Sequence, residues 1–192
     1  MIPSVKGIAI QSTIEDLRKL VEGGGLSREA LEAELPAEDL RALDEEVAVA
    51  RWYPIATHQR MLELLARHEG AGRRTEYLLA RGARAADRIA ALGLYRQLDL
   101  STEQFGARVG SMIVTVSGAI YNFTRWVYVP EDPGAAISFR IQVDEAADFP
   151  ETAVLTSQGF IEQIASKASG APVRVTHERP RPDRVLFRGR GR

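Results

Sequence analysis

The chain has 192 residues, of which 45% are hydrophobic, and its formal net charge is −1. This length and apolar fraction suit a folded domain and exclude wholesale disorder. The small net charge gives no global field that would attract nucleic acid or an anionic membrane. Cysteine is absent, which excludes disulfides, thiolate metal sites and cysteine nucleophiles. We find no signal peptide and no apolar run long enough to cross a bilayer, so we expect a soluble, cytoplasmic protein.

The first part of the chain is predicted to be helical. The run 5–12 is a short β-like stretch that predicts an edge strand or an arm. Three glycines at 23–25 break the chain, and Ser27 stands where a helix N-cap is expected. Pro36 and Pro54 each mark the start of a further helix.

Two longer helices are expected next, over about 73–92 and 105–120. On the first, Gly82 and Ala85 are small, which permits either the close approach of another helix or a flat ligand. The second run is rich in β-branched residues, but it keeps helical spacing, and the capping-box spacing at 101–104 favours a helix.

The apolar period changes in the last third of the chain. The runs 125–129 and 137–144 predict a hairpin, Pro150 starts a helix that ends near Gly170, and 173–188 predicts a closing hairpin. Strict alternation with polar residues predicts that one face of the second strand is buried. The residues expected on that face are Ile137, Phe139, Ile141 and Val143.

These patterns predict an α+β fold in a single domain, 1–192. A helical part at about 13–121 is expected to pack with a β-β-α-β-β antiparallel sheet at about 124–188. The remaining residues, 189–192, are expected to form a basic tail. The arginine-rich segment 179–192 that contains this tail is either a solvated end or a surface for RNA or an acidic partner.

No known catalytic or metal-binding motif is present. The chain lacks a phosphate-binding loop, the H-E-x-x-H pattern and the G-x-S-x-G pattern, so we predict no enzyme and no catalytic residue. His58 and His68 are ten positions apart on one predicted helix, more than two turns, and therefore cannot hold one metal ion together. We predict no metal site.

His58 is the one polar residue in an otherwise apolar helix stripe that includes Ile55 and Leu65. One interpretation is a packed, neutral core histidine. The other is an axial haem ligand, or a polar anchor in an apolar pocket. Nearby aromatic residues could belong to the core or to such a pocket. The candidate pocket residues are His58, Trp52, Tyr53, Leu62, Trp126 and Phe139.

The helical part resembles a family of uncharacterised myxobacterial proteins that has a Trp-Tyr-Pro helix start, a glycine, and a long helix ending in Gly-x-Tyr. The residues that carry this resemblance are Trp52, Tyr53, Pro54, Gly70, Gly93 and Tyr95. The β-β-α-β-β part is similar to the small-molecule-sensing domains of the haem-nitric-oxide-binding and vinyl-reductase-associated type. The Y-x-S-x-R haem clamp of the haem-nitric-oxide-binding domains is absent. The resemblance implies a ligand-sensing or adaptor role.

We therefore predict a non-catalytic sensor or adaptor without a cofactor, which binds a small apolar molecule or a protein partner and forms a homodimer. We expect no membrane and no nucleic-acid partner. The alternative is a haem or other cofactor protein that uses His58. An enzyme with a dispersed site is a third hypothesis, for which the sequence nominates no residues.

Overall fold

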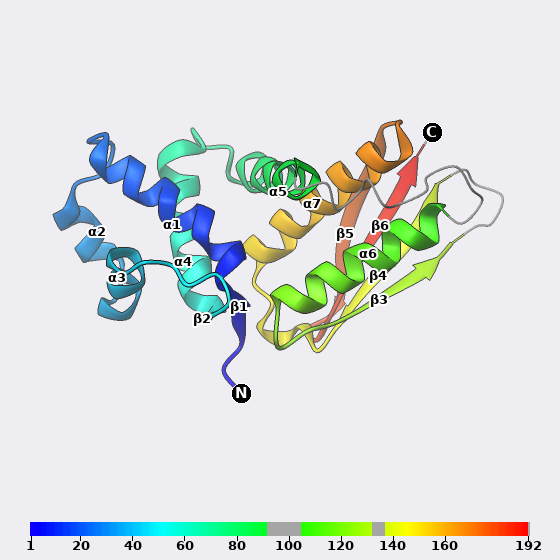
Figure 1. Cartoon of the computed structure of the whole chain (residues 1–192), viewed down its shortest axis with the longest axis horizontal. Coiled ribbons are helices and arrows are strands. Elements are labelled where there is room, and N and C mark those ends of the chain that lie inside the picture. The colour runs from blue at the N-terminus through cyan, green and yellow to red at the C-terminus, as the bar shows by residue number, and fades with distance from the viewer. Residues whose placement is uncertain (92–104, 132–136, 192) are drawn as a thin grey trace. The chain divides into compact units, whose positions relative to one another are not determined.

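The computed structural model describes residues 1–91, 105–131 and 137–191. The chain forms two compact units (Figure 1). We call residues 1–77 with 120–122 the helical unit, and residues 78–119 with 123–192 the sheet unit. The predicted α+β fold is confirmed, and the single domain stays a prediction.

The helical unit contains four helices and two short strands among its described residues. They are β1 (Ser4–Lys6), α1 (Gly7–Glu22), α2 (Arg28–Glu34), α3 (Ala37–Asp44), β2 (Trp52–Pro54) and α4 (Ile55–Glu69). The predicted start of α2 is confirmed, because the Ser27 hydroxyl accepts a hydrogen bond from the Ala30 amide at 3.1 Å. Pro36 and Pro54 directly precede α3 and α4, and Gly70 ends α4.

The β-like run 5–12 is a strand only as far as Lys6, so that prediction is wrong for its larger part. Helix α1 begins at Gly7, whose amide donates to the Arg51 carbonyl at 2.8 Å. Its β-branched residues are tolerated in a helix because the stripe they form is buried; for example, Ile10 and Ile14 are fully covered. Strand β1 pairs antiparallel with β2.

Helix α4 supplies much of the core of the helical unit. Its buried residues include Met61, Leu64 and Leu65, and it packs against α1. Its polar side is fixed to α3 by Asp39, a fully buried carboxylate. Asp39 accepts hydrogen bonds from the Thr57 hydroxyl at 2.6 Å and from Arg60 Nε at 2.6 Å. The paired acid therefore joins the two helices at a buried position.

The sheet unit contains the predicted β-β-α-β-β arrangement, which is confirmed. Its helices and strands are α5 (Arg74–Ala91), α6 (Phe105–Ile120), β3 (Arg125–Pro130), β4 (Ser138–Asp144), the 3-10 turn η1 (Ala146–Asp148), α7 (Glu151–Ser169), β5 (Val173–Arg181) and β6 (Arg184–Gly191). The first residues of α5 belong to the helical unit. The strands form an antiparallel sheet in the order β3-β4-β6-β5. Pro150 precedes α7, and Gly170 ends it in the left-handed conformation.

Helix α7 contacts β5 and β6, and Gly110 of α6 lies against the ring of Tyr128 of β3, which is paired with the buried Ile141. The two helices therefore cover the same face of the sheet, which we call the inner face (Figure 1). The alternation predicted for β4 is confirmed at Phe139, Ile141 and Val143, which are all buried, whereas Ile137 is only half-buried and precedes the strand. Cross-strand neighbours on the same face include Trp126 beside Val143 and Phe187 beside Ile141. The opposite, outer face carries the polar residues of each strand.

The predicted tail, 189–192, is wrong for its described residues, because β6 continues to Gly191. The Gly191 amide donates to the Ile137 carbonyl at 3.0 Å. Gly189 is paired with Phe139 and lies so close to its ring that a Cβ atom there would be 2.2 Å from the ring tip. Gly189 therefore makes room for a core side chain.

Helix α5 packs closely on α7 at two glycines. A Cβ atom on Gly82 would lie 1.9 Å from the Thr156 carbonyl oxygen, and one on Gly159 would lie 2.0 Å from the Leu79 carbonyl oxygen. The small stripe of α5 therefore serves helix packing, the first of its two interpretations. The capping box at 101–104 and the residues Gly93 and Tyr95 lie outside the described residues. No helix within the described ranges is long and apolar enough to span a membrane.

Candidate functional site

His58 lies in the core of the helical unit. It is 6% exposed, and its Nε2 atom is 3.2 Å from the Thr13 hydroxyl of α1. Thr13 is itself almost fully buried, so the pair satisfies two polar groups inside the α1–α4 contact. Leu62, one turn along α4, is 2% exposed. The geometry corresponds to a packed histidine that joins two helices.

The two aromatic residues predicted beside His58 differ in their surroundings. Tyr53 is buried, and its hydroxyl accepts a hydrogen bond from the Ala48 amide at 3.1 Å. Trp52 is 38% exposed, and the Lys6 ammonium lies 4.0 Å from its ring centre. Trp52 therefore forms a surface cation–π contact, while Tyr53 fixes the loop before β2.

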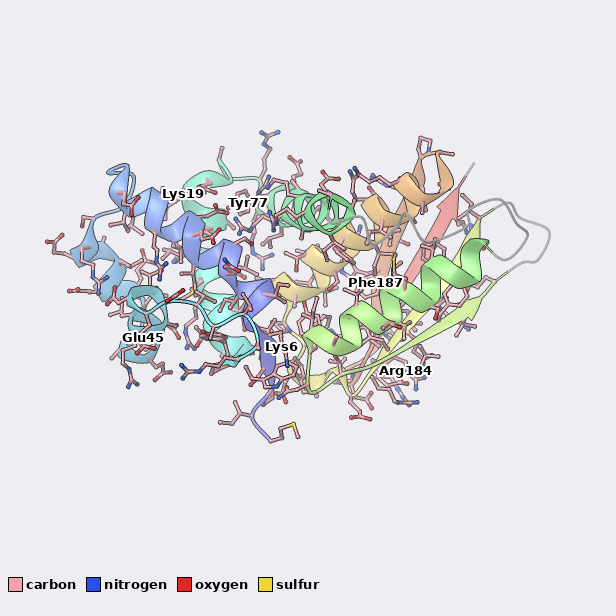
Figure 2. The ribbon with its side chains drawn as sticks, viewed as in Figure 1. Lys6, Lys19, Glu45, Tyr77, Arg184 and Phe187 are labelled. Carbon is pink, nitrogen blue, oxygen red and sulfur yellow. The ribbon has the colours of Figure 1, made fainter. Side chains whose placement is uncertain are left out.

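Trp126 and Phe139 belong to the sheet unit, so the six predicted pocket residues are divided between the two units. Trp126 stacks on Phe187 with ring centres 5.9 Å apart and contacts Phe149 edge-on at 5.8 Å. Phe187, labelled in Figure 2, belongs to β6 and is fully buried. Phe139 is 3% exposed and lies 6.3 Å from the Tyr128 ring. These rings form the inner-face core.

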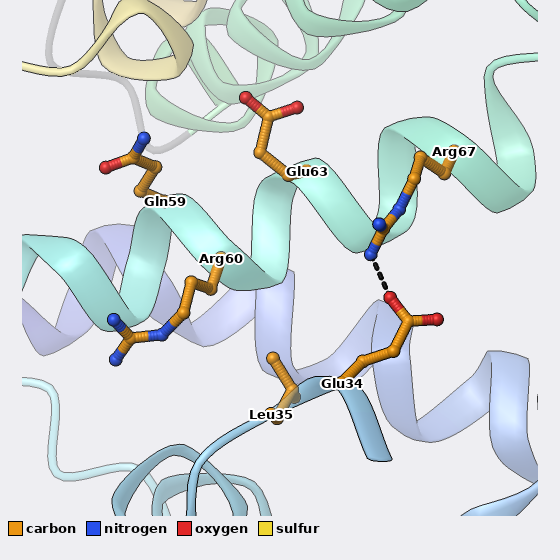
Figure 3. Close-up of a pocket in the computed structure, with 6 residues that line it drawn as sticks. All are labelled: Glu34, Leu35, Gln59, Arg60, Glu63 and Arg67. Carbon is orange, nitrogen blue, oxygen red and sulfur yellow. Dashed lines mark hydrogen bonds and ion pairs between the residues drawn. The ribbon is translucent and has the colours of Figure 1, made fainter. Parts of the chain in front are cut away.

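A hollow of about 280 Å³ opens on the polar side of α4 (Figure 3). It is lined by Glu34, Leu35, Gln59, Arg60, Glu63 and Arg67. Five of its six lining residues are polar or charged, unlike those of the predicted apolar pocket, and the charged ones pair with one another or with neighbours. Glu34 accepts a hydrogen bond from Arg67, and Glu63 accepts one from Arg74 Nε at 2.8 Å.

These ion pairs determine the electrostatics of the hollow. Hydrogen bonding from Arg74 lowers the pKa of Glu63 below its usual value, against the opposing effect of burial. Hydrogen bonding to Asp39 raises the pKa of Arg60. The charged lining side chains are two acids and two arginines, so their charges balance. The charged lining of the hollow could be anticipated from the sequence, because Arg60, Glu63 and Arg67 share the polar face of the predicted helix.

The described residues offer no cluster of three or more His, Asp or Glu side chains that could hold a metal ion. Comparison with protein-family models and with curated proteins gave no match. The resemblance to a myxobacterial family therefore stays a prediction.

Solved structures of H-NOX proteins match almost the whole chain. An Fe(II) unliganded H-NOX protein from K. algicida aligns with a TM-score of 0.61 and 14% identity, covering 97% of this chain and 96% of that one. An H-NOX protein from S. oneidensis in the Fe(II)NO state aligns with a TM-score of 0.60 and 14% identity, covering 97% and 99%. A single-site mutant of T. Tengcongensis H-NOX aligns with a TM-score of 0.57 and 14% identity, covering 97% of both chains. The chain therefore has the H-NOX fold.

These neighbours overturn the prediction of a protein without a cofactor. They are described in iron-bound states, and one of them comes from a study of heme distortion in the H-NOX family. The sequence predicted a similarity to haem-nitric-oxide-binding domains for the β-β-α-β-β part alone, whereas the structural similarity to H-NOX proteins extends over both units. The fold thus directs attention to haem and to the residues that could hold it.

Axial ligation by histidine does not fit the residues of this chain. The sequence has three histidines, and all lie in described ranges. His58 is engaged in the helical core, as described above. His68 is exposed in the last turn of α4. The ring nitrogens of His177 lie 2.5 Å from Gln158 Oε1 and 3.3 Å from Glu151 Oε1.

Proposed function

We propose that this chain is a non-catalytic sensor domain that binds haem, and that His58 maintains the fold and does not hold the iron. The observation that carries this proposal is the likeness to H-NOX proteins over 97% of the chain. That likeness establishes the fold, and the fold supports haem as the first ligand to examine.

The position of His58 supports the second half of the proposal. An imidazole that bonds to iron must turn one ring nitrogen toward the metal. Here Nε2 faces the Thr13 hydroxyl within a packed interface of two helices, and Nδ1 is buried in the same core. Withdrawing Nε2 would leave Thr13 buried without this partner, at a cost of about 1–3 kcal/mol. We therefore assign the binding of haem to groups other than this ring.

Native mass spectrometry of the protein isolated from cells supplied with iron and a haem precursor tests the proposal. We expect a mass above the 21.2 kDa chain by one haem, together with a Soret absorption band. The same measurement on His58→Gln, which keeps a group able to bond to Thr13, should give the same haem content. Wild-type protein that carries no haem, and gains none when haem is added, contradicts haem binding. Loss of haem from a folded His58→Gln variant contradicts the role given to His58.

A further inference from the structure

The outer face of the sheet concentrates arginine side chains on three neighbouring strands. Arg140 on β4 is directly opposite Arg188 on β6, and Arg190 on β6 is directly opposite Arg174 on β5. Arg188 and Arg190 are two residues apart and therefore share the face. We call these four residues the arginine face; they are Arg140, Arg174, Arg188 and Arg190.

This arrangement costs stability. Like charges directly opposite each other on neighbouring strands repel, and both cross-strand pairs are of this kind. Glu131 lies 3.6 Å from Arg140, and Glu178 lies 3.0 Å from Arg188. These acids offset part of the repulsion and leave an excess of positive charge.

Two arginines of this face, Arg174 and Arg190, are exposed and have hydrogen-bonding capacity that described acids leave largely unused. The Nε atom of Arg140 has no hydrogen-bond acceptor among the described residues, but it is buried and therefore out of reach of an incoming ligand. The Arg174 side chain is 83% exposed, and its nearest carboxylate, on Glu162, is 3.7 Å away. Arg190 is exposed and forms no ion pair with any described acid. The face can therefore form new charge-assisted hydrogen bonds to an incoming anion.

We propose that the arginine face binds an acidic segment of a partner protein. The inference goes beyond the proposed sensor function, because it concerns the face of the sheet opposite the covering helices. Arginine is enriched in protein interfaces, and the same face carries the aliphatic residues Val127, Val129 and Leu186. Carboxylates of the partner supply the charge complementarity that the repelling pairs lack.

Two observations favour a protein over a nucleic acid. Single-stranded nucleic acids bind to exposed aromatic rings on which bases stack. In the described strands of this four-stranded sheet the aromatic residues alternate onto the inner face, as Trp126, Phe139 and Phe187 do. The mixed aliphatic and charged character matches a protein surface.

The spacing of the strand suggests a suitable probe. An extended peptide places every second side chain about 7 Å apart, which matches two arginines that are two residues apart on one strand, such as Arg188 and Arg190. The probe is therefore a fluorescein-labelled peptide of about 12 residues in which Glu and Thr alternate. Fluorescence anisotropy at low ionic strength measures its affinity for the full chain.

The test compares two neutralised variants of equal charge. Arg174→Gln/Arg190→Gln removes the two exposed arginines of the face, whereas Arg41→Gln/Arg73→Gln removes exposed arginines of the helical unit. We expect the first variant to bind the peptide about tenfold more weakly and the second to bind it within about twofold of wild type. The first variant should also keep its fold, because it relieves like-charge repulsion.

Equal affinities of the two variants would overturn the proposal. Tighter binding of a single-stranded RNA of similar length than of the peptide would replace the protein partner with a nucleic acid. Self-association of the chain that is sensitive to salt and lost in Arg174→Gln/Arg190→Gln would identify a second copy as the occupant instead. Equal binding of a Lys-Thr peptide would show that charge does not determine recognition.

Discussion

Gly82 of α5 and Gly159 of α7 lie on the contacting faces of their two helices, and each leaves room for the backbone of the other helix. A Cβ atom on Gly82 would lie 1.9 Å from the Thr156 carbonyl oxygen, and one on Gly159 would lie 2.0 Å from the Leu79 carbonyl oxygen. Because both obstacles are backbone atoms, neither can move without displacing a helix. The pair thus determines how closely the helices approach.

Gly82→Ala should therefore lower the free energy of unfolding by about 1–3 kcal/mol through overpacking. Gly118→Ala is the matched control, because Gly118 lies in α6 and a Cβ atom there meets nothing within 4 Å. The control should gain up to about 1 kcal/mol from helix propensity. Urea denaturation measures both. Equal effects of the two changes would mean that α5 and α7 do not approach as described.

Phe139 tests the inner face of the sheet. It is 3% exposed and packs beside Tyr128 and over Gly189. Phe139→Ala should destabilise the protein by about 3–5 kcal/mol, because it leaves a cavity in the core. Gln142→Ala on the same strand, on the outer face, should cost far less. A loss below about 1 kcal/mol for Phe139→Ala would contradict the register of β4.

Gly189→Ala distinguishes an ordered strand from a solvated tail. The added methyl group would lie 2.2 Å from the Phe139 ring, so we expect a loss of about 1–3 kcal/mol of stability. Arg190→Ala, at the exposed neighbouring position, should change stability by less than about 0.5 kcal/mol. Thermal unfolding followed by circular dichroism compares them. A neutral Gly189→Ala change would restore the tail interpretation.

The Glu63–Arg74 pair gives a prediction about pH. The pKa of Glu63 is lowered in the folded chain by the hydrogen bond from Arg74. A carboxylate whose pKa is lower in the folded chain stabilises the fold fully at pH values above the pKa of the unfolded chain, which is about 4.3 for Glu. This contribution is lost as the pH falls through the pKa of the folded chain. Since both side chains are partly exposed, Glu63→Gln should cost no more than about 1 kcal/mol at pH 7. The difference from wild type should shrink as the pH falls through the folded pKa of Glu63, and a difference that does not change with pH would mean that packing is responsible.

Much of the fold could be predicted because its signals are local. Ser27 marks a helix start because its hydroxyl accepts a hydrogen bond from a backbone amide of the first turn. Pro150 marks another because proline lacks the backbone N–H that would have no partner at a helix start. Gly170 ends α7 because it adopts the left-handed conformation. The buried face of β4, which includes Phe139 and Ile141, could be predicted from the two-residue period of a strand alone. Such features depend on a few neighbouring residues and can be read from sequence.

The remaining features depend on distant partners. Strands β1 and β2 have three residues each and exist through pairing with each other, so neither has a periodic signal. The place of Gly189 in an ordered strand could not be predicted, because the ring that requires a glycine there belongs to a different strand. For the candidate site, burial of His58 followed from its helix stripe, whereas its bond to Thr13 required the tertiary structure. The predicted pocket combined residues that the fold assigns to different units.

The most direct measurement of the central claim is a titration of the isolated chain with hemin and, in parallel, with iron-free protoporphyrin IX, in wild type and in His58→Gln. If haem is bound without a bond from His58, both proteins should give saturable hemin binding with the same Soret maximum, and protoporphyrin IX should bind them with equal affinity. His68→Gln serves as the control for an exposed histidine. A Soret maximum or hemin affinity that changes in folded His58→Gln alone, while protoporphyrin binding stays constant, would show that His58 holds the iron and contradict the account.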